Sequence, residues 1–102
     1  MEVTSTIEGH AGRVVVNGDV DSETSPQLES AIAALLTGGV TELVVDVGAV
    51  SFLSSAGLSV LIGAQRDADV FRLERGNRIV DRLVSLTGLS ILYGEEDARP
   101  AS

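Results

Sequence analysis

Two neighbouring serines, Ser54 and Ser55, are the residues of this sequence with the clearest capacity for a chemical modification. They stand directly before Ala56 and Gly57, at the expected start of a helix. The first turn of a helix has unpaired backbone N–H groups and the positive end of the helix dipole, so it would stabilise a phosphoryl group on Ser55. The alternative is that both serines only cap the helix, and the residue pattern by itself favours that simpler interpretation.

Three acidic residues, Asp19, Asp21 and Asp46, each stand near the expected end of a strand. Carboxylates grouped in this way can hold Mg²⁺, as in receiver domains whose phosphoacceptor is an aspartate, a role that Asp46 would take here. The sequence has no lysine to neutralise a phosphoryl group at such a site. We therefore prefer the interpretation that Asp19 and Asp21 are turn residues and that Asp46 makes hydrogen bonds at a strand end.

The remaining residue types exclude several kinds of catalytic site. The only histidine, His10, lies in a predicted hairpin turn, and no Gly-x-Ser-x-Gly motif accompanies the serines. Without cysteine or lysine the chain has no thiolate nucleophile, no disulfide and no Schiff-base chemistry. We expect no enzymatic activity, no cofactor and no metal ion.

The charge of the chain bears on its partners and its location. The chain has 7 basic and 15 acidic residues, for a formal net charge of -8. This balance argues against nucleic acid as a partner, because that binding depends on neutralising phosphates. The sequence has neither a long apolar stretch nor the basic start of a signal peptide, so we expect no membrane partner and a cytoplasmic protein.

Short apolar runs mark the expected strands. Residues 3–8 and 13–17 have the pattern of a β-hairpin. Residues 43–47 form a nearly unbroken apolar run, which predicts a central strand parallel to its neighbour. Residues 70–73 predict a short strand, and residues 91–93 a last strand at the edge of the sheet.

Three helices are expected between these strands. The first begins with Ser25 as its N-cap and Pro26 at the first helical position. The second begins at Ser54 or Ser55, and the third spans about residues 76–88. This order predicts one α/β domain, a mixed sheet of about four to five strands flanked by three helices.

In folds of this kind, functional groups gather where strand ends meet helix starts. Residues 18–21 and 48–57 are the two segments expected at such points. The acidic residues of the first segment and the serines of the second are therefore the candidate site of this chain.

Four spaced segments together resemble a known family. They are Gly18-Asp19-Val20-Asp21, an apolar strand ending at Asp46, residues 50–58 (VSFLSSAGL) and residues 83–89 (LVSLTGL). In this combination the chain strongly resembles the STAS domain of bacterial anti-sigma factor antagonists over roughly residues 3–93. The resemblance implies a STAS-like mixed sheet flanked by helices in residues 1–94, which leaves residues 95–102 as an acidic, flexible tail.

The resemblance also implies partner switching. In that family the unphosphorylated antagonist binds an anti-sigma factor that is also a serine kinase, and this binding frees the sigma factor until phosphorylation ends it. A phosphatase restores the binding. By this match the phosphoacceptor is Ser55, which follows Ser54 where the family usually has aspartate. The partner-binding residues that the match implies are Gly18, Asp19, Asp21, Ser54, Ser55, Ala56, Gly57 and Leu58.

Two alternatives stand beside this hypothesis. One is a STAS module that binds or scaffolds its partner without phosphorylation. The other is a receiver-like, Mg²⁺-dependent phosphoacceptor at Asp46. A phosphoserine survives acid whereas an acyl phosphate is labile to both acid and base, so the stability of a phosphorylated product distinguishes serine from aspartate chemistry.

Overall fold

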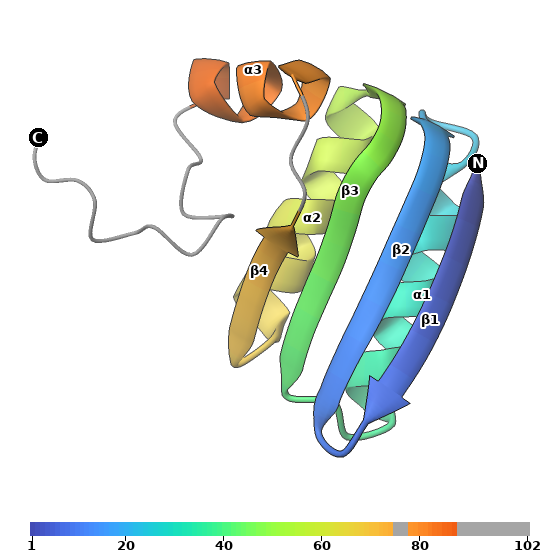
Figure 1. Ribbon diagram of the computed structural model, residues 1–102, viewed down its shortest axis with the longest axis vertical. Helices are drawn as coiled ribbons and strands as arrows, with labels where there is room; N and C mark the ends of the chain where they lie inside the picture. The colour runs from blue at the N-terminus through green and yellow to red at the C-terminus, as the bar shows by residue number, and fades with distance from the viewer. Residues whose placement is uncertain (75–77, 88–102) are drawn as a thin grey trace, which may run out of the picture.

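The computed structural model describes residues 1–74 and 78–87, with residues 83–87 described by their backbone alone. In this part of the chain, strands and helices alternate after an N-terminal hairpin (Figure 1). The elements are β1 (Glu2–Glu8), β2 (Ala11–Val20), α1 (Ser25–Thr37), β3 (Glu42–Leu53), α2 (Ser55–Asp67), β4 (Val70–Glu74) and α3 (Arg78–Thr87). None of these helices, within the described ranges, is long and apolar enough to cross a membrane. The strand expected at residues 91–93 and the helix end expected at Gly88 lie outside the described residues.

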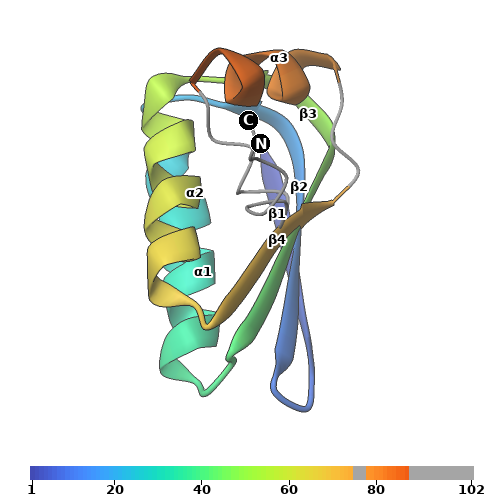
Figure 2. The ribbon, with the colours of Figure 1, turned by 90° about the vertical axis from the view of Figure 1, so that its left-hand side faces the viewer.

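The strands form one mixed sheet in the order β1-β2-β3-β4. β1 pairs antiparallel with β2, whereas the β2–β3 and β3–β4 pairs are parallel. β3 therefore lies between two strands, as the unbroken apolar run at residues 43–47 predicts. Both α1 and α2 cover one face of the sheet, and α3 packs against β3 near the end where that strand finishes (Figure 2). The predicted α/β domain, a mixed sheet with three helices, is confirmed.

The core lies between the sheet and the two covering helices. In β3, Leu43, Val45 and Val47 are buried at every second position, but the next buried residues, Val50 and Leu53, follow at intervals of three. Two register shifts between β2 and β3 explain the change, because each bulge adds one residue to β3 and keeps the apolar side chains on the buried face. The prediction that this strand ends near Val47 is wrong, because the bulges let it continue to Leu53.

The start of α1 also differs from the prediction. Thr24 is the N-cap, and Ser25 is a buried residue of the first turn. The preceding turn is held by Asp21, whose Oδ1 accepts hydrogen bonds from the N–H groups of Glu23 (3.0 Å) and Thr24 (2.9 Å). In return, Thr24 Oγ1 accepts one from the Asp21 N–H at 2.9 Å. The two residues thus form a reciprocal pair of hydrogen bonds in the turn before α1, and the N-cap Thr24 makes no side-chain hydrogen bond to the helix. The prediction that Ser25 is the N-cap is wrong.

Candidate functional site

The two segments expected at strand ends meet at one edge of the sheet. Because β2 and β3 are parallel, their carboxyl ends lie at the same edge, where Val20 pairs with Leu53. The Ser54 N–H donates a hydrogen bond to the Val20 carbonyl oxygen at 2.8 Å. Residues 18–21 and 54–58 thus form one continuous region, which we call the switch edge.

Ser54 is the N-cap of α2. Its Oγ accepts a hydrogen bond from the Gly57 N–H at 3.2 Å, and its carbonyl oxygen accepts one from the Leu58 N–H at 2.9 Å. The Ser54 backbone is extended (φ -82°, ψ 172°), as is usual for a capping residue. The sequence leaves open which serine caps the helix, and the structure assigns that role to Ser54.

Ser55 is the first residue of α2, and its side chain is exposed. The cap engages the amides of Gly57 and Leu58, so the amides of the first turn left for another acceptor are those of Ser55 and Ala56. The Ser55 hydroxyl is not part of the cap. A phosphoryl group on it would lie at the positive end of the α2 dipole.

Gly57 and Leu58 hold the start of α2 against the sheet. Gly57 is buried, and Leu58 is only 7% exposed. A Cβ atom on Gly57 would lie 2.7 Å from both Leu53 Cδ1 and Val20 Cγ1, closer than side-chain atoms approach. Only glycine allows α2 to begin so near the ends of β2 and β3, so these two residues position Ser55 and contribute little exposed surface themselves.

The acidic residues of the switch edge differ in their surroundings. Asp21 is half-buried, and the hydrogen bond from the Thr24 N–H, followed by that of the Thr24 hydroxyl, lowers the pKa of its carboxyl. Thr24 Oγ1 lies 3.0 Å from Asp21 Oδ1. Asp19, by contrast, is exposed. Asp21 thus has a structural role at the start of α1, whereas the Asp19 carboxylate faces solvent.

Gly18 lies near the end of β2, directly before Asp19. Its φ of +104° lies in the left-handed region, which glycine adopts without strain. A Cβ atom there would also come within 3.2 Å of Met1 Cα. Glycine at position 18 therefore allows the backbone conformation that occurs next to the second register shift of β2 and β3.

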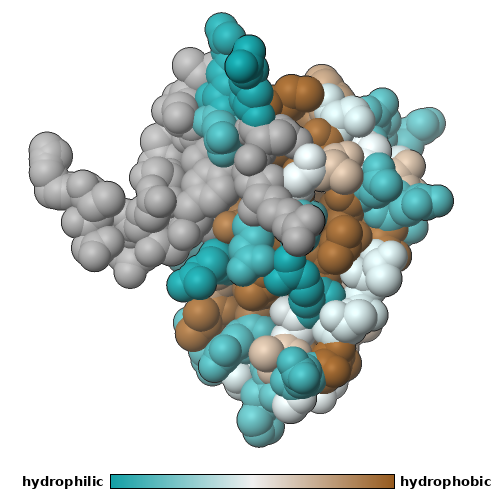
Figure 3. All heavy atoms as spheres, viewed as in Figure 1, coloured by the Kyte–Doolittle hydropathy of each residue, from teal (hydrophilic) through white to brown (hydrophobic). Residues whose placement is uncertain are grey.

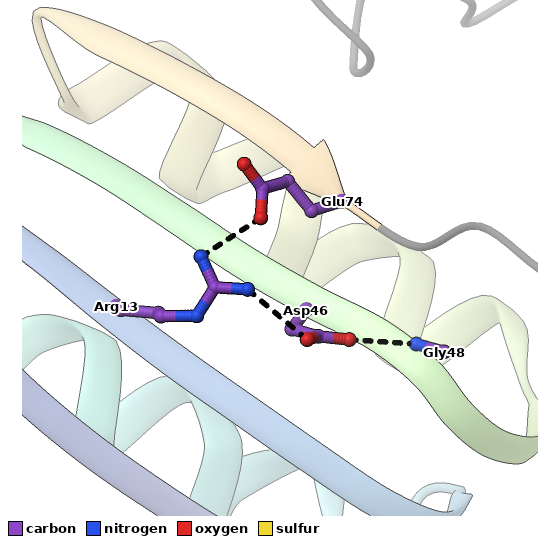
Figure 4. Close-up of polar contacts among 4 residues, drawn as sticks. All are labelled: Arg13, Asp46, Gly48 and Glu74. Atoms are coloured by element: carbon purple, nitrogen blue, oxygen red, sulfur yellow. Dashed lines mark hydrogen bonds and ion pairs between the residues drawn. The ribbon is translucent and has the colours of Figure 1, made fainter.

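Asp46 lies on the face of the sheet opposite α1 and α2, away from the switch edge, and is only 6% exposed. Its Oδ2 accepts a hydrogen bond from Arg13 Nη2 at 3.1 Å, and Arg13 Nη1 is 2.8 Å from Glu74 Oε1 (Figure 4). Its Oδ1 accepts a hydrogen bond from the Gly48 N–H at 3.0 Å. The hydrogen bond to Glu74 is the main cause that raises the pKa of Arg13. Asp46 therefore belongs to an ionic cluster that connects β2, β3 and β4.

This placement corrects the expectation that Asp46 stands at a strand end beside Asp19 and Asp21. Because β3 continues to Leu53, Asp46 pairs in register with Val15 and lies inside the strand. Across residues 1–74 and 78–87, no group of three or more His, Cys, Asp or Glu side chains is arranged to hold a metal ion. The geometry does not support a receiver-like phosphoacceptor at Asp46.

Sequence reasoning missed two features of this structure. Phe52, which pairs with Asp19 across β2 and β3, is 50% exposed at the switch edge although it stands in an apolar run. Arg13 joins Asp46 across a separation of 33 residues, which no local motif signals. The single histidine, His10, lies in the turn between β1 and β2, at the opposite end of β2 from the switch edge.

Comparison with known proteins assigns the chain to a family. Residues 3–94 match the family model described as Mlab, STAS domain. An anti-sigma-B factor antagonist of Staphylococcus aureus (strain NCTC 8325 / PS 47) is 29% identical in an alignment of 97 residues that covers 90% of this chain and 89% of that protein. The anti-sigma-F factor antagonist RsfB of Mycobacterium tuberculosis (strain CDC 1551 / Oshkosh) is 39% identical in an alignment of 61 residues that covers 58% of this chain and 50% of that protein.

Solved structures show the same fold. An anti-sigma factor antagonist from Mycobacterium paratuberculosis superposes with a TM-score of 0.82 at 29% identity, covering 90% of this chain and 81% of that one. The anti-sigma factor antagonist SpoIIAA in its unphosphorylated form superposes with a TM-score of 0.77 at 16% identity, covering 90% and 85% of the two chains, a likeness of fold alone. The chain belongs to the STAS domain family of anti-sigma factor antagonists, which are regulatory proteins and not enzymes.

Proposed function

We propose that the unphosphorylated chain binds an anti-sigma factor, so that the sigma factor held by that protein is released. Its binding surface is the switch edge together with the exposed side of α2, within a binding module of residues 1–94. Phosphorylation of Ser55 by the anti-sigma factor, acting as a serine kinase, ends the binding. A serine phosphatase restores it.

The exposed hydroxyl of Ser55 is the observation that carries this proposal. Ser54 already caps α2, so Ser55 can be modified while the cap stays intact. The bond between Ser54 and Val20 joins the helix start to the end of β2, so a partner that covers Ser55 also meets Asp19. The two named relatives are themselves antagonists of anti-sigma factors, which supports the same class of partner for this chain.

A phosphoryl group on Ser55 would weaken this complex directly. It adds about -1.5 to -2 charges at neutral pH, and a partner seated on the switch edge would have to bury them. If the partner is a kinase, its own nucleotide phosphates lie next to Ser55 and repel the new charge. Each penalty of about 1.4 kcal/mol lowers the affinity tenfold, so a local effect suffices without a large conformational change.

The proposal is tested with the full chain and its cognate anti-sigma factor. Mass spectrometry after incubation with ATP should place one phosphate on Ser55, and calorimetry should show that the phosphorylated chain no longer binds. Ser55→Ala should bind the anti-sigma factor and resist phosphorylation. Ser55→Glu should bind weakly although its circular dichroism is unchanged.

Ser30→Ala is the matched control, because Ser30 is an exposed helical serine in α1, outside the proposed binding surface. This variant should be phosphorylated and should lose binding as the wild type does. Phosphate on Ser54 or Ser59 instead would contradict the assignment of Ser55. A chain that binds the anti-sigma factor but receives no phosphate during incubation with ATP would favour the phosphorylation-independent module. A chain that does not bind the anti-sigma factor at all would overturn the proposed function.

A further inference from the structure

Phe52 is an aromatic side chain that the fold leaves half in water. It stands in β3, two residues before the cap Ser54, and is 50% exposed. The only other phenylalanine, Phe71, is 8% exposed and belongs to the core. A Phe side chain has a large apolar area, and leaving half of it in water forgoes stability that full burial would provide.

Exposure alone does not mark an interface, because other apolar side chains of this protein are also exposed. The face of the molecule seen in Figure 3 shows apolar side chains among polar ones. Val15 and Val70, for example, are 37% and 51% exposed. Phe52 differs from these by its position. The second register shift lies beside it, and its partner across the sheet is Asp19 of the switch edge.

The charged side chains of the two segments beside Phe52 all have one sign, whereas α3, which packs against β3, carries Arg78 and Arg82. Residues 17–24 and 50–59, which form the strand ends and helix starts of this edge, contain three acidic residues and no basic residue. Of these three, Asp19 and Glu23 are exposed and Asp21 is half-buried. A partner that covers Phe52 and these two segments therefore meets acidic side chains beside an apolar centre.

We propose that Phe52 is the apolar anchor of the anti-sigma factor complex, and that the partner presents an apolar recess whose rim carries arginine or lysine side chains opposite Asp19 and Glu23. This inference rests on the proposed function and adds the chemistry of the partner's surface to it. Aromatic anchors in desolvated pockets dominate many interfaces, and complementary charges at the rim accelerate association.

The anchor is tested by measuring the dissociation constant of the anti-sigma factor for Phe52 variants of the full chain. Phe52→Ala should weaken binding at least about tenfold, and Phe52→Leu, which keeps an apolar side chain, should weaken it less. Val70→Ala is the control, because Val70 is 51% exposed at the start of β4, at the other end of the sheet. It should bind within about twofold of the wild type. Thermal unfolding of each variant shows whether it is folded at the temperature of the assay.

The charged rim is tested by the rate of association and its dependence on salt. Asp19→Asn and Glu23→Gln should each slow association and make it less sensitive to ionic strength. Glu42→Gln is the control, because it also removes one negative charge but lies at an exposed site at the start of β3. It should have little effect on the rate of association. Association that becomes faster in Asp19→Asn and Glu23→Gln would overturn the basic rim.

The outcomes separate this inference from the proposed function. If the wild type binds and Phe52→Ala binds equally well, the anchor is overturned and the proposed function stands. If the wild type does not bind a cognate anti-sigma factor, both fail. If Phe52→Ala loses binding while Ser55 of the wild type is phosphorylated as expected, both are supported.

Discussion

At the scale of single residues, the switch edge depends on two side chains that precede two helices. Asp21 holds the turn that leads into α1, and Ser54 caps α2. Both stand directly after strands that are neighbours in the sheet, so the two side chains lie at one edge. This division of roles leaves the Ser55 hydroxyl outside the capping bonds at the first position of α2, where a phosphoryl group would find unpaired amides.

The first prediction separates the two serines by stability. Ser54→Ala should lower the free energy of unfolding by about 1 kcal/mol, because it removes the acceptor of the Gly57 N–H. Ser55→Ala should change it by less than about 0.5 kcal/mol, because an exposed residue outside the cap is replaced by a good helix former. Urea unfolding followed by circular dichroism measures both values. Equal losses in the two variants would contradict the assignment of the cap.

The second prediction concerns pH. The hydrogen bonds from Thr24 lower the pKa of Asp21 below its ordinary value of 3.8 in the folded protein. The ionised carboxylate therefore stabilises the fold fully above that value, and this contribution is lost as the pH falls through the lower, folded-state pKa. The melting temperature of the wild type should exceed that of Asp21→Asn at neutral pH, and the difference should shrink below about pH 4. A difference in melting temperature that stays constant as the pH falls through this range would show that Asp21 is not stabilised in its ionised form.

At the scale of elements, the start of α2 is set by close contact with the two strands before it. Gly57 is the point of contact, since it faces Leu53 and Val20 with no room for a side chain. The bulges in β3 contribute as well, because they keep Val50 and Leu53 on the buried face up to the cap. This packing sets how close the start of α2 lies to the ends of β2 and β3, and therefore where Ser55 lies.

The third prediction tests that contact. Gly57→Ala should lower the free energy of unfolding by about 1–3 kcal/mol, because its Cβ would lie 2.7 Å from Leu53 Cδ1 and Val20 Cγ1. Gly63→Ala is the control on the same helix, where the nearest atom to an added Cβ is the flexible end of Arg66 at 3.7 Å. This variant should gain up to about 1 kcal/mol from helix propensity. Chemical denaturation of both variants decides the point, and a Gly57→Ala protein as stable as the wild type would contradict the tight packing.

At the scale of the whole molecule, the sheet provides a rigid frame and the switch edge lies at one end of it. β3 is paired on both sides and covered by helices on one face, whereas β1 pairs only with β2 and is exposed along most of its length. The chain carries a net charge of -8. Near the switch edge, Asp19 and Glu23 are exposed, so their carboxylates lie in water. The partner-binding surface that we propose therefore lies at one end of the sheet, where Asp19 and Glu23 are exposed.

The fourth prediction follows from that frame. The amides of Val44 and Val45, in the middle of the sheet, should be among the slowest of the described residues to exchange with deuterium. Amides of β1 that face the open edge should exchange faster, because that strand can separate locally from β2. Hydrogen exchange followed by NMR measures both groups, and rapid exchange at Val44 and Val45 would contradict their interior position.

The sequence by itself determined the features that local periodicity encodes. The unbroken run at residues 43–47 predicts an interior strand, the Ser-Ser-Ala-Gly segment predicts a helix start, and the order of elements predicts a mixed sheet. These predictions hold because the burial of alternate side chains of a strand, or of one side of a helix, constrains residues close together in the chain. The family resemblance rests on the same local segments, at their characteristic spacing.

Tertiary structure alone decided how those segments meet. Two bulges carry β3 past Gly48, so Asp46 pairs with Arg13 instead of joining Asp19 at the edge. Thr24 takes the place of Ser25 as the N-cap of α1, and the Asp21 carboxylate holds the turn before it. The exposure of Phe52 likewise depends on the register with β2. Such outcomes depend on contacts between residues far apart in the chain and on single-residue shifts of strand register, which reverse the face of every following side chain and leave no periodic signal in the sequence.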